Sequence, residues 1–313
     1  GFFTSVEDFL SVAALNSYTK VSSREYFSAR SLMSSRHISQ QLLDFALEPL
    51  TRVIYDQNLS ESHAFASLVA VTAAVGAASF DSGNSILVER LFNSSGATVH
   101  LSTKVTRIIS QESSSMYSVR SCSMDNRCSN ELAEIVILAC PFEHADISFK
   151  PAVEVRSREW RHWYVTVTRA RSLNPAFFGE PAGKPLEYDN VLTTENSSRT
   201  IPFNVLQLEA RLSDGTALWK FFSNEDISDK LPMIFEGWSR EPADTVVQHW
   251  PYTFPVLRPL GNSSTERYQP IVLQPGLVYL NTMESVASAM EGSVIAARNA
   301  ALLLHNKALM SES

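Results

Sequence analysis

The sequence predicts an α+β protein, in which helices and antiparallel sheets alternate along a chain of 313 residues. Apolar residues recur at helical spacing within residues 1–60 and 285–304. Residues 97–140 and 160–223 instead alternate and are rich in β-branched side chains, which is typical of strands. With 44% hydrophobic residues, the chain can bury a core for one big domain or two intertwined ones.

The first sixty residues are predicted to be helical. The segments "TSVEDFLSVAAL" and "SSREYFSARSLM" each open with a capping-box pattern, Thr4 with Glu7 and Ser22 with Glu25. The segment "ISQQLLDFALEPLTRVIYDQ" also has helical spacing. We expect a bend at Pro49, because proline has no N–H to donate within a helix.

Two apolar stretches approach the length of a membrane span. Residues 63–80, "HAFASLVAVTAAVGAASF", are Ala-rich and end at a turn, so we expect a buried core helix there. The 285–304 helix carries Glu291 and Arg298 in its middle, and charges at that place disfavour spanning. We therefore expect no transmembrane span.

The middle of the chain predicts a turn, a short amphipathic helix and a glycine stop in "DSGNSILVERLFNSSG". Three strands should follow in "ATVHLSTKVTRIIS", "MYSVRSCS" and "ELAEIVILACP", and three consecutive antiparallel strands form a meander. "HWYVTVTRA", "FNVLQLEARL" and "TALWKFFS" predict a second, mostly antiparallel sheet. Residues 224–262 are polar and proline-rich.

The C-terminal block, "GLVYLNTMESVASAMEGSVIAARNAALLLHN", predicts a strand, a turn at Asn281–Thr282 and a long helix. Helix N-termini carry free N–H groups and a partial positive charge, so a flat or anionic ligand can approach them. Close packing against another element explains small residues equally well, and both explanations stay open. The small residues at the expected helix start are Ser285, Ala287, Ser288 and Ala289.

The cysteines do not form a disulfide scaffold, since there are only three. Cys122 and Cys128 flank an expected hairpin tip and could be bridged across it, whereas Cys140 follows an apolar run and is expected to be a buried thiol. Four glycosylation sequons favour a secretory or vacuolar route, at Asn58, Asn93, Asn196 and Asn262.

Charge and motifs exclude several classes of function. The net charge of −7 with mixed signs and no basic stripe argues against nucleic acid as the main partner. The sequence has no Gly-x-Ser-x-Gly, His-Glu-x-x-His, Cys-x-x-Cys or Gly-x-Gly-x-x-Gly motif. The seven histidines are scattered, so we expect no metal site.

Several segments together resemble one enzyme family. "LVYLNTMESVASAMEGSVIAARNAALL" closely resembles the C-terminal flavin-contacting element of the prenylcysteine oxidases, also called prenylcysteine lyases. Further similar segments follow in the same order over roughly residues 40–306: "LEPLTRVIYDQN", "DSGNSILVERLF", "EIVILACP", "DNVLTTENSS", "DGTALWKFFS" and "WPYTFP".

The resemblance implies a glutathione-reductase-like FAD fold that is related to the amine oxidases. Residues 81–145 and 265–313 would form a remnant FAD-binding domain, and residues 1–80 and 146–264 a substrate-binding domain with helices and an antiparallel sheet. The family begins with a dinucleotide-binding βαβ segment that this sequence does not contain, so we expect an N-terminally truncated version of the fold.

The resemblance also implies an FAD-dependent oxidoreductase that uses O₂. Its reaction would cleave the thioether of a prenylated cysteine, or of a related prenyl or terpenoid compound, to a prenyl aldehyde, a free thiol and H₂O₂. Such chemistry needs an apolar tunnel rather than a strong acid or nucleophile, so we assign no catalytic residue. The alternative is a non-catalytic prenyl-binding or scaffold protein. We expect a location in the secretory pathway, in the lysosome or vacuole, or outside the cell. Association with a membrane surface is left open.

The resemblance assigns residues to two binding sites. Thr282 stands where the family usually has Gly, so a positive φ at this turn would cost Thr282 about 1–2 kcal/mol. The expected FAD contacts are Ser82, Gly83 and Asn84 near the ring, the Val105 backbone at the adenine, and Asn281, Thr282, Met283 and Glu284 along the ribityl–pyrophosphate side. The aromatics expected to line the substrate tunnel are Tyr55, Phe65, Trp219, Phe221, Trp250 and Tyr252.

Overall fold

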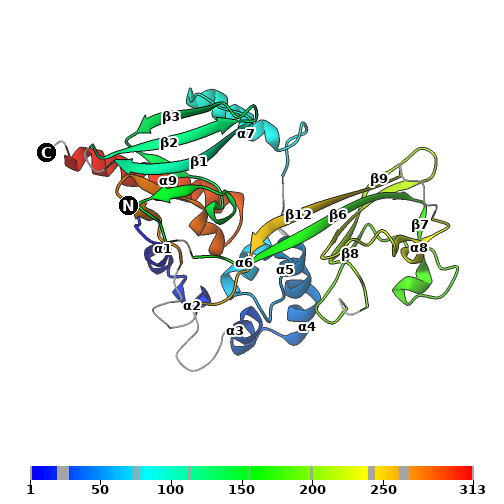
Figure 1. Ribbon diagram of the computed structural model, residues 1–313. Helices are drawn as coiled ribbons and strands as arrows, with labels where there is room; N and C mark the ends of the chain where they lie inside the picture. The colour runs from blue at the N-terminus through cyan, green and yellow to red at the C-terminus, as the bar shows by residue number, and fades with distance from the viewer. Residues whose placement is uncertain are drawn as a thin grey trace. The chain divides into compact units, whose positions relative to one another are not determined.

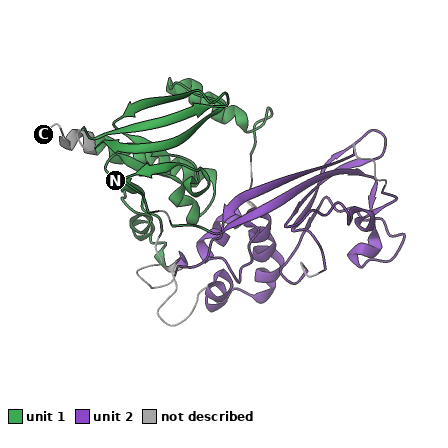
Figure 2. Cartoon of the chain, viewed as in Figure 1, with its two compact units in different colours: residues 1–16, 73–158, 267–313 green, residues 17–72, 159–266 purple. Residues whose placement is uncertain are grey.

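A computed structural model describes residues 2–19, 28–72, 76, 78–111, 114–154, 156–197, 200–238, 244–260 and 268–311. The chain divides into two compact units, and both are discontinuous in sequence (Figures 1 and 2). Unit 1 consists of Gly1–Asn16, Ala73–Arg158 and Arg267–Ser313, and unit 2 of Ser17–Thr72 and Glu159–Glu266.

The unit boundaries differ from the expected division mainly at the N-terminus, where residues 1–16 belong to unit 1. Hydrogen bonds explain this placement. The Phe3 N–H donates to Asn299 Oδ1 at 2.9 Å, and Asn299 Nδ2 donates back to the Phe3 carbonyl at 2.9 Å. Which unit binds cofactor and which binds substrate stays a prediction.

The first helix of unit 1 is α1 (Val6–Val12), which buries Val6 and Leu10. Its capping box joins Ser5 and Asp8, one residue after the predicted pair of Thr4 and Glu7. The difference arises because Asp8 Oδ2 accepts hydrogen bonds from the backbone N–H groups of both Thr4 and Ser5. The second predicted capping box, Ser22 with Glu25, lies outside the described residues.

Unit 1 contains the predicted meander. Strands β1 (Thr103–Gln111), β2 (Met116–Ser123) and β3 (Cys128–Ala133) pair antiparallel, and β5 (Ser148–Lys150) joins β1 in parallel. The predicted helix before them is α7 (Ser85–Ser95). It ends as expected at Gly96, which has a φ of 68°.

The third predicted strand of the meander is wrong in its extent. The segment "ELAEIVILACP" divides after Ala133, and β4 (Val136–Leu138) leaves the meander for a second sheet. There it runs parallel to β14 (Leu277–Tyr279), which pairs antiparallel with β13 (Val272–Gln274). Leu138 joins this sheet to the meander, because it shares one buried cluster with Ile108 and Leu277. The apolar run is therefore continuous in sequence but serves two sheets.

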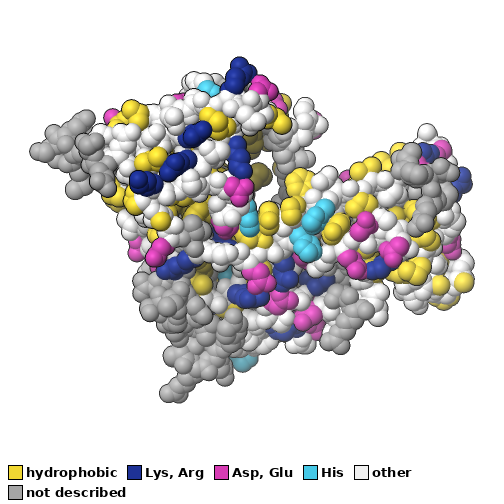
Figure 3. All heavy atoms as spheres, in the orientation of Figure 1, with side chains coloured by type: hydrophobic (Ala, Val, Ile, Leu, Met, Phe, Trp, Pro, Cys, Tyr) yellow, Lys and Arg dark blue, Asp and Glu magenta, His cyan; other side chains and the backbone are white. Residues whose placement is uncertain are grey.

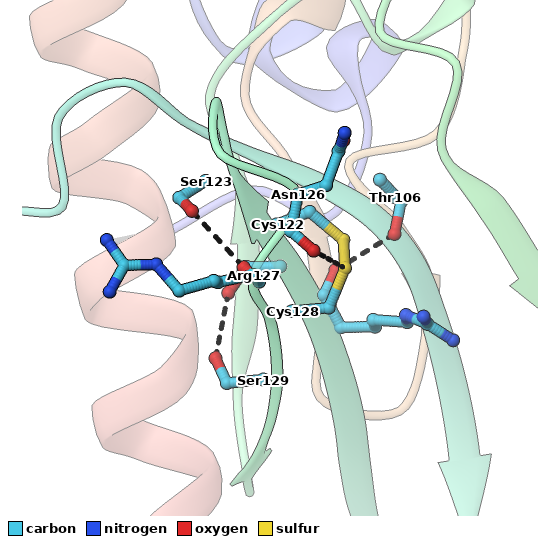
Figure 4. The surroundings of a disulfide bond; sticks show 9 residues. Thr106, Cys122, Ser123, Asn126, Arg127, Cys128 and Ser129 are labelled. Atoms are coloured by element: carbon cyan, nitrogen blue, oxygen red, sulfur yellow. Dashed lines mark hydrogen bonds between the residues drawn. A yellow bond between two sulfur atoms is a disulfide. The ribbon is translucent and has the colours of Figure 1, made fainter.

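The disulfide predicted between Cys122 and Cys128 is present. The two residues face each other directly across β2 and β3, with Cα atoms 4.0 Å apart (Figure 4). At the hairpin tip the Ser123 hydroxyl donates to the Arg127 carbonyl at 3.4 Å. The prediction for Cys140 is wrong, since this thiol is exposed just after β4 turns toward the surface.

Unit 2 is built on a five-stranded antiparallel sheet, and its three predicted strands are confirmed. An additional edge strand contains Pro251. The sequence predicted no strand in this polar, proline-rich region. Proline is tolerated here because the strand lies at an edge and its register shifts between Trp250 and Phe254. The strands lie in the order β12 (Thr245–Pro255), β6 (Trp160–Ala170), β10 (Ala217–Ser223), β9 (Val205–Arg211) and β8 (Asn190–Leu192).

Five α-helices in the described part of residues 16–72 come before this sheet in sequence. A π-helical turn, Leu43–Leu47, precedes α5, whose second residue is Pro49, so the helix widens next to the proline at which we expected a bend. No helix in the described part of the chain is long and apolar enough to cross a membrane. The helices are α2 (Asn16–Thr19), α3 (Ala29–Ser35), α4 (Gln40–Leu42), α5 (Glu48–Tyr55) and α6 (Ala64–Thr72), the last shorter than the apolar stretch 63–80.

The alternation of buried and half-buried side chains along β10 determines which of its residues form the main core of unit 2. Because side chains alternate across a strand, Ala217, Trp219 and Phe221 all point to one face, and each is buried. Short elements cover this face and supply Leu173, Leu231 and Phe235 to the same cluster. These elements are β7 (Ser172–Leu173), a 3₁₀ turn (Pro175–Phe178), α8 (Leu231–Ile234) and β11 (Phe235–Glu236).

Candidate functional site

The candidate site lies in unit 1, at the turn that follows β14. The chain passes from Tyr279 into a 3₁₀ helix, Asn281–Ser285, and then into the long helix α9 (Met290–Ser311). The predicted helix start at Ser285 is therefore too early. Residues 286–289 are irregular, and they bring the small residues of this stretch beside the first turn of α9.

Arg158 holds the turn in place. Only 12% of its side chain is exposed. Its Nε donates to Glu143 Oε1 at 2.6 Å, its Nη2 to the Tyr279 hydroxyl at 2.7 Å and its Nη1 to the Asn281 carbonyl at 2.9 Å. Tyr279 also donates to Glu143 Oε2 at 3.2 Å. One guanidinium thus ties the end of β14 and the start of the 3₁₀ helix to the segment after β4.

Burial dominates the electrostatics of this turn. It raises the pKa of the Tyr279 hydroxyl well above its usual range, so this group stays protonated and can donate to Glu143. Burial also raises the pKa of the Glu284 carboxyl, although Asn281 and Arg158 act in the opposite direction. The turn therefore combines one neutral donor, the Tyr279 hydroxyl, with one fixed cation, Arg158, which pairs with the Glu143 carboxylate.

A narrow cleft of about 80 Å³ opens between the turn and the start of α9. Gly292 borders it, and a Cβ there would lie 3.1 Å from the Ala287 carbonyl oxygen. Close packing of the chain against itself therefore explains this small residue. The cleft is lined by Ala139, Leu280, Asn281, Met283, Glu284, Ala287, Ala289, Gly292 and Ser293.

One polar atom at the cleft points to a ligand. Asn281 Oδ1 is buried and accepts no hydrogen bond within the described part of the chain, while the Nδ2 of the same side chain donates to Glu284 Oε1 at 2.9 Å. A buried acceptor without a donor is costly, so an N–H or O–H of a bound group would stabilise it. Ligand pockets usually measure about 300–1,000 Å³, so this cleft is too small to enclose a whole flavin.

Thr282 does not behave as the resemblance implies. It lies within the 3₁₀ helix, so the turn needs no positive φ at this residue and the expected strain is absent. Its side chain is fully buried, and its hydroxyl donates to the Gln269 carbonyl instead of facing the cleft. Of the four predicted contacts in this turn, only Asn281, Met283 and Glu284 border the cleft.

The other predicted FAD contacts lie elsewhere in unit 1. Ser82, Gly83 and Asn84 form an exposed turn before α7, with a positive φ of 86° at Gly83. Val105 is half-buried in β1 and packs on the core of this unit. No hydrogen bond among the described residues joins either segment to the turn at 281–284, so their part in binding FAD stays a prediction.

The six aromatic residues predicted to line a tunnel fall into separate environments of unit 2. Tyr55, Trp219 and Phe221 are buried core residues, because each packs among apolar neighbours. Trp250 and Tyr252 are about half exposed on β12, where hydrophobic side chains gather on the surface (Figure 3), and Phe65 is half-buried on α6. The described residues do not bring the six around one cavity, and their role in binding substrate stays untested.

This chain matches known proteins over nearly its whole length. The sequence profile described as "Prenylcysteine lyase" matches residues 1–312. Farnesylcysteine lyase of Arabidopsis thaliana is 27% identical over 99% of this chain and 57% of its own length, and human prenylcysteine oxidase 1 is 26% identical over 86% and 55%. The chain therefore spans little more than half the length of these relatives.

A solved structure shares the fold. A triple mutant of putrescine oxidase, made in a redesign of cofactor binding, superposes on 93% of this chain and 69% of its own, with a TM-score of 0.52 and 14% identity. The expected α+β fold of the amine-oxidase kind is thereby confirmed, whereas so low an identity carries no information about substrate.

Proposed function

Because the chain belongs to the prenylcysteine lyase family, we propose that it takes part in the oxidative cleavage of a prenylated cysteine or a related prenyl thioether. In balanced form, R–CH₂–S–R′ with O₂ and H₂O gives R–CHO, R′–SH and H₂O₂. The match of the family profile to residues 1–312 is the observation that carries this proposal. The comparisons do not favour the non-catalytic alternative.

The cofactor in this proposal is FAD, which when bound supplies the two-electron oxidation of the carbon next to sulfur. In this chain, Asn281 would accept a hydrogen bond from the cofactor through its buried Oδ1, and Met283 and Glu284 would border the same edge. Arg158 fixes the backbone carbonyl of Asn281, and the side-chain amide is oriented by its Nδ2, which donates to Glu284 Oε1. The first turn of α9 adds N–H groups that favour negative charge nearby.

Titration of the purified chain with FAD tests this assignment. We expect FAD at a hundredfold excess over Kd to stabilise the chain by about 2.7 kcal/mol, seen as a raised thermal midpoint. Asn281→Ala removes the buried acceptor and should weaken FAD binding about five- to tenfold, since such a hydrogen bond contributes roughly 1–1.5 kcal/mol. Asn130→Ala, at an exposed position of β3, is the matched control. Equal affinity in the two variants contradicts the assignment, and no shift with FAD contradicts cofactor binding by this chain.

We further propose a secretory, lysosomal, vacuolar or extracellular location, with the substrate taken from a membrane surface. The disulfide supports an oxidising compartment. Asn93 and Asn196 are exposed and open to glycosylation, whereas the Asn58 amide donates to Glu61 at 2.8 Å. The fourth sequon, at Asn262, lies outside the described residues. We expect glycosidase treatment of the protein from a eukaryotic host to lower its mass, and Asn93→Gln with Asn196→Gln to reduce that change. An unchanged mass contradicts the proposed route.

A further inference from the structure

A second cavity, of about 370 Å³, lies wholly within unit 2 and has a charged lining. Its walls come from the end of α5, the segment after it, the start of β6, the loop before β9 and the segment after β10. Figure 3 shows acidic and basic side chains intermixed on this unit. None of these residues takes part in the site in unit 1, so the cavity needs an explanation of its own.

The first cation of this lining, Arg52, already uses most of its N–H donors. Its Nη1 donates to Asn58 Oδ1 and its Nη2 to Asn204 Oδ1, while Thr193 Oγ1 lies 3.4 Å from Nε. Only 6% of the residue is exposed. Four of the five N–H donors of Arg52 are thus used, so it fixes the amides around the cavity and sets a positive potential there.

The second cation, Arg161, has donors to spare. Its Nη2 pairs with Glu61 Oε2, but its Nε is buried and has no hydrogen-bond partner in the described part of the chain. A guanidinium offers a planar fork that fits a carboxylate through two parallel hydrogen bonds. An unpaired buried Nε at this cavity therefore points to an anionic ligand group.

The opposite charge is supplied by Asp56, which is only 5% exposed. It caps α5 in a left-handed conformation, with φ at 54°, and its Oδ1 accepts from Asn204 Nδ2. Burial raises the pKa of Asp56 to about 6, although Arg161 and Arg52 favour the ionised form. Asp56 therefore places a buried carboxylate in the wall of the cavity, where a ligand cation can pair with it.

The balance of charge selects the kind of ligand. Arg52 and Arg161 face Asp56 and Glu61 around one cavity, and the further acid, Glu225, pairs with Lys230. A simple anion would meet two carboxylates there, and a simple cation would meet two guanidinium groups. A molecule with both charges close together can pair with both at once.

We propose that this cavity binds the α-ammonium and α-carboxylate groups of an amino acid with an apolar side chain. Arg161 would take the carboxylate and Asp56 the ammonium, while Ile201 and Pro202 supply an apolar wall for the first side-chain atoms. Resting on the proposed function, we assign this head group to the cysteine end of the prenylated substrate.

Calorimetric titration with S-butylcysteine, without FAD, tests the site. Asp56→Asn keeps an oxygen acceptor and tolerates the left-handed conformation, and Arg161→Met removes the fork. We expect each to weaken binding at least tenfold, and Arg161→Lys to recover part of the loss. Arg169→Met is the matched control, since Arg169 lies on the same strand but pairs with Asp214.

The ligand itself provides a test that needs no variant. N-acetylation removes the ammonium charge and esterification removes the carboxylate charge, and we expect each to weaken binding to the unaltered protein at least tenfold. Affinities that do not change with the variants or the ligand charges overturn the proposal, and so does a complete lack of binding. If FAD binds while no amino acid does, only this site fails; if the amino acid binds while FAD does not, the cofactor assignment fails and this site stands.

Discussion

Replacing Arg158 by methionine is expected to lower the free energy of unfolding of unit 1 by about 3–5 kcal/mol, the usual cost of removing one partner of a buried ion pair. Arg158 donates to Glu143, Tyr279 and the Asn281 carbonyl at 2.6–2.9 Å. Only 6% of the Glu143 side chain is exposed. The variant therefore leaves a buried carboxylate without its cation, and methionine fills most of the volume without replacing the hydrogen bonds.

Denaturant unfolding of both proteins measures this cost. Arg127→Met is the matched control, because 83% of the Arg127 side chain is exposed and its pair with Asp125 is solvated. The double variant Arg158→Met with Glu143→Gln should regain part of the stability, since the uncompensated charge is then gone. A loss below about 1 kcal/mol for Arg158→Met would mean that the guanidinium does not hold the turn.

The role of Arg158 shows why the site could be predicted only in part. Similarity to a family located residues 281–284, because the quoted segment is continuous in sequence. The partners of Arg158 lie 15, 121 and 123 residues away, so no local pattern connects them. Tyr279, at the end of an apolar strand, is the only nearby sequence feature that indicates this site, and it is equally typical of a core residue.

The fold, like the site, could be predicted only in part. Strands β6, β9 and β10 were predictable because alternation and β-branched residues occur together with clear turns. Strand β12 was missed, since the two prolines of "HWPYTFP" are poor strand formers and are tolerated only at an edge with a shifted register. The end of β3 was misplaced because one apolar run supplies two sheets, and periodicity cannot show where a strand changes its partner.

The charged cavity of unit 2 had no sequence signal at all. Arg52 and Asp56 are one helical turn apart, but Arg161 and Asn204 join them from elements more than a hundred residues later. Isolated charges in a sequence are usually solvated, so nothing distinguished these from the others. Only packing shows that they are buried around one space.

The second large effect is expected at Gly276, where the chain enters β14 beside β4. Gly276 has a φ of 84°, and a Cβ added there would lie 2.8 Å from the Glu134 carbonyl oxygen and 3.2 Å from the Tyr117 ring. The backbone strain costs about 1–2 kcal/mol and the overpacking about 1–3 kcal/mol. We therefore expect Gly276→Ala to destabilise unit 1 by about 2–5 kcal/mol in denaturant unfolding.

Gly96→Ala separates the two causes, because Gly96 also has a positive φ, of 68°, but a Cβ there meets open space. It should cost only the backbone strain, and equal losses in the two variants would show that the contact with Glu134 does not matter. The Gly276 carbonyl accepts from the Val136 N–H at 2.8 Å, so a shift at Gly276 changes the pairing of β14 with β4. Since β14 leads directly into Asn281, Gly276→Ala should also weaken FAD binding in molecules that remain folded, which Gly96→Ala should not.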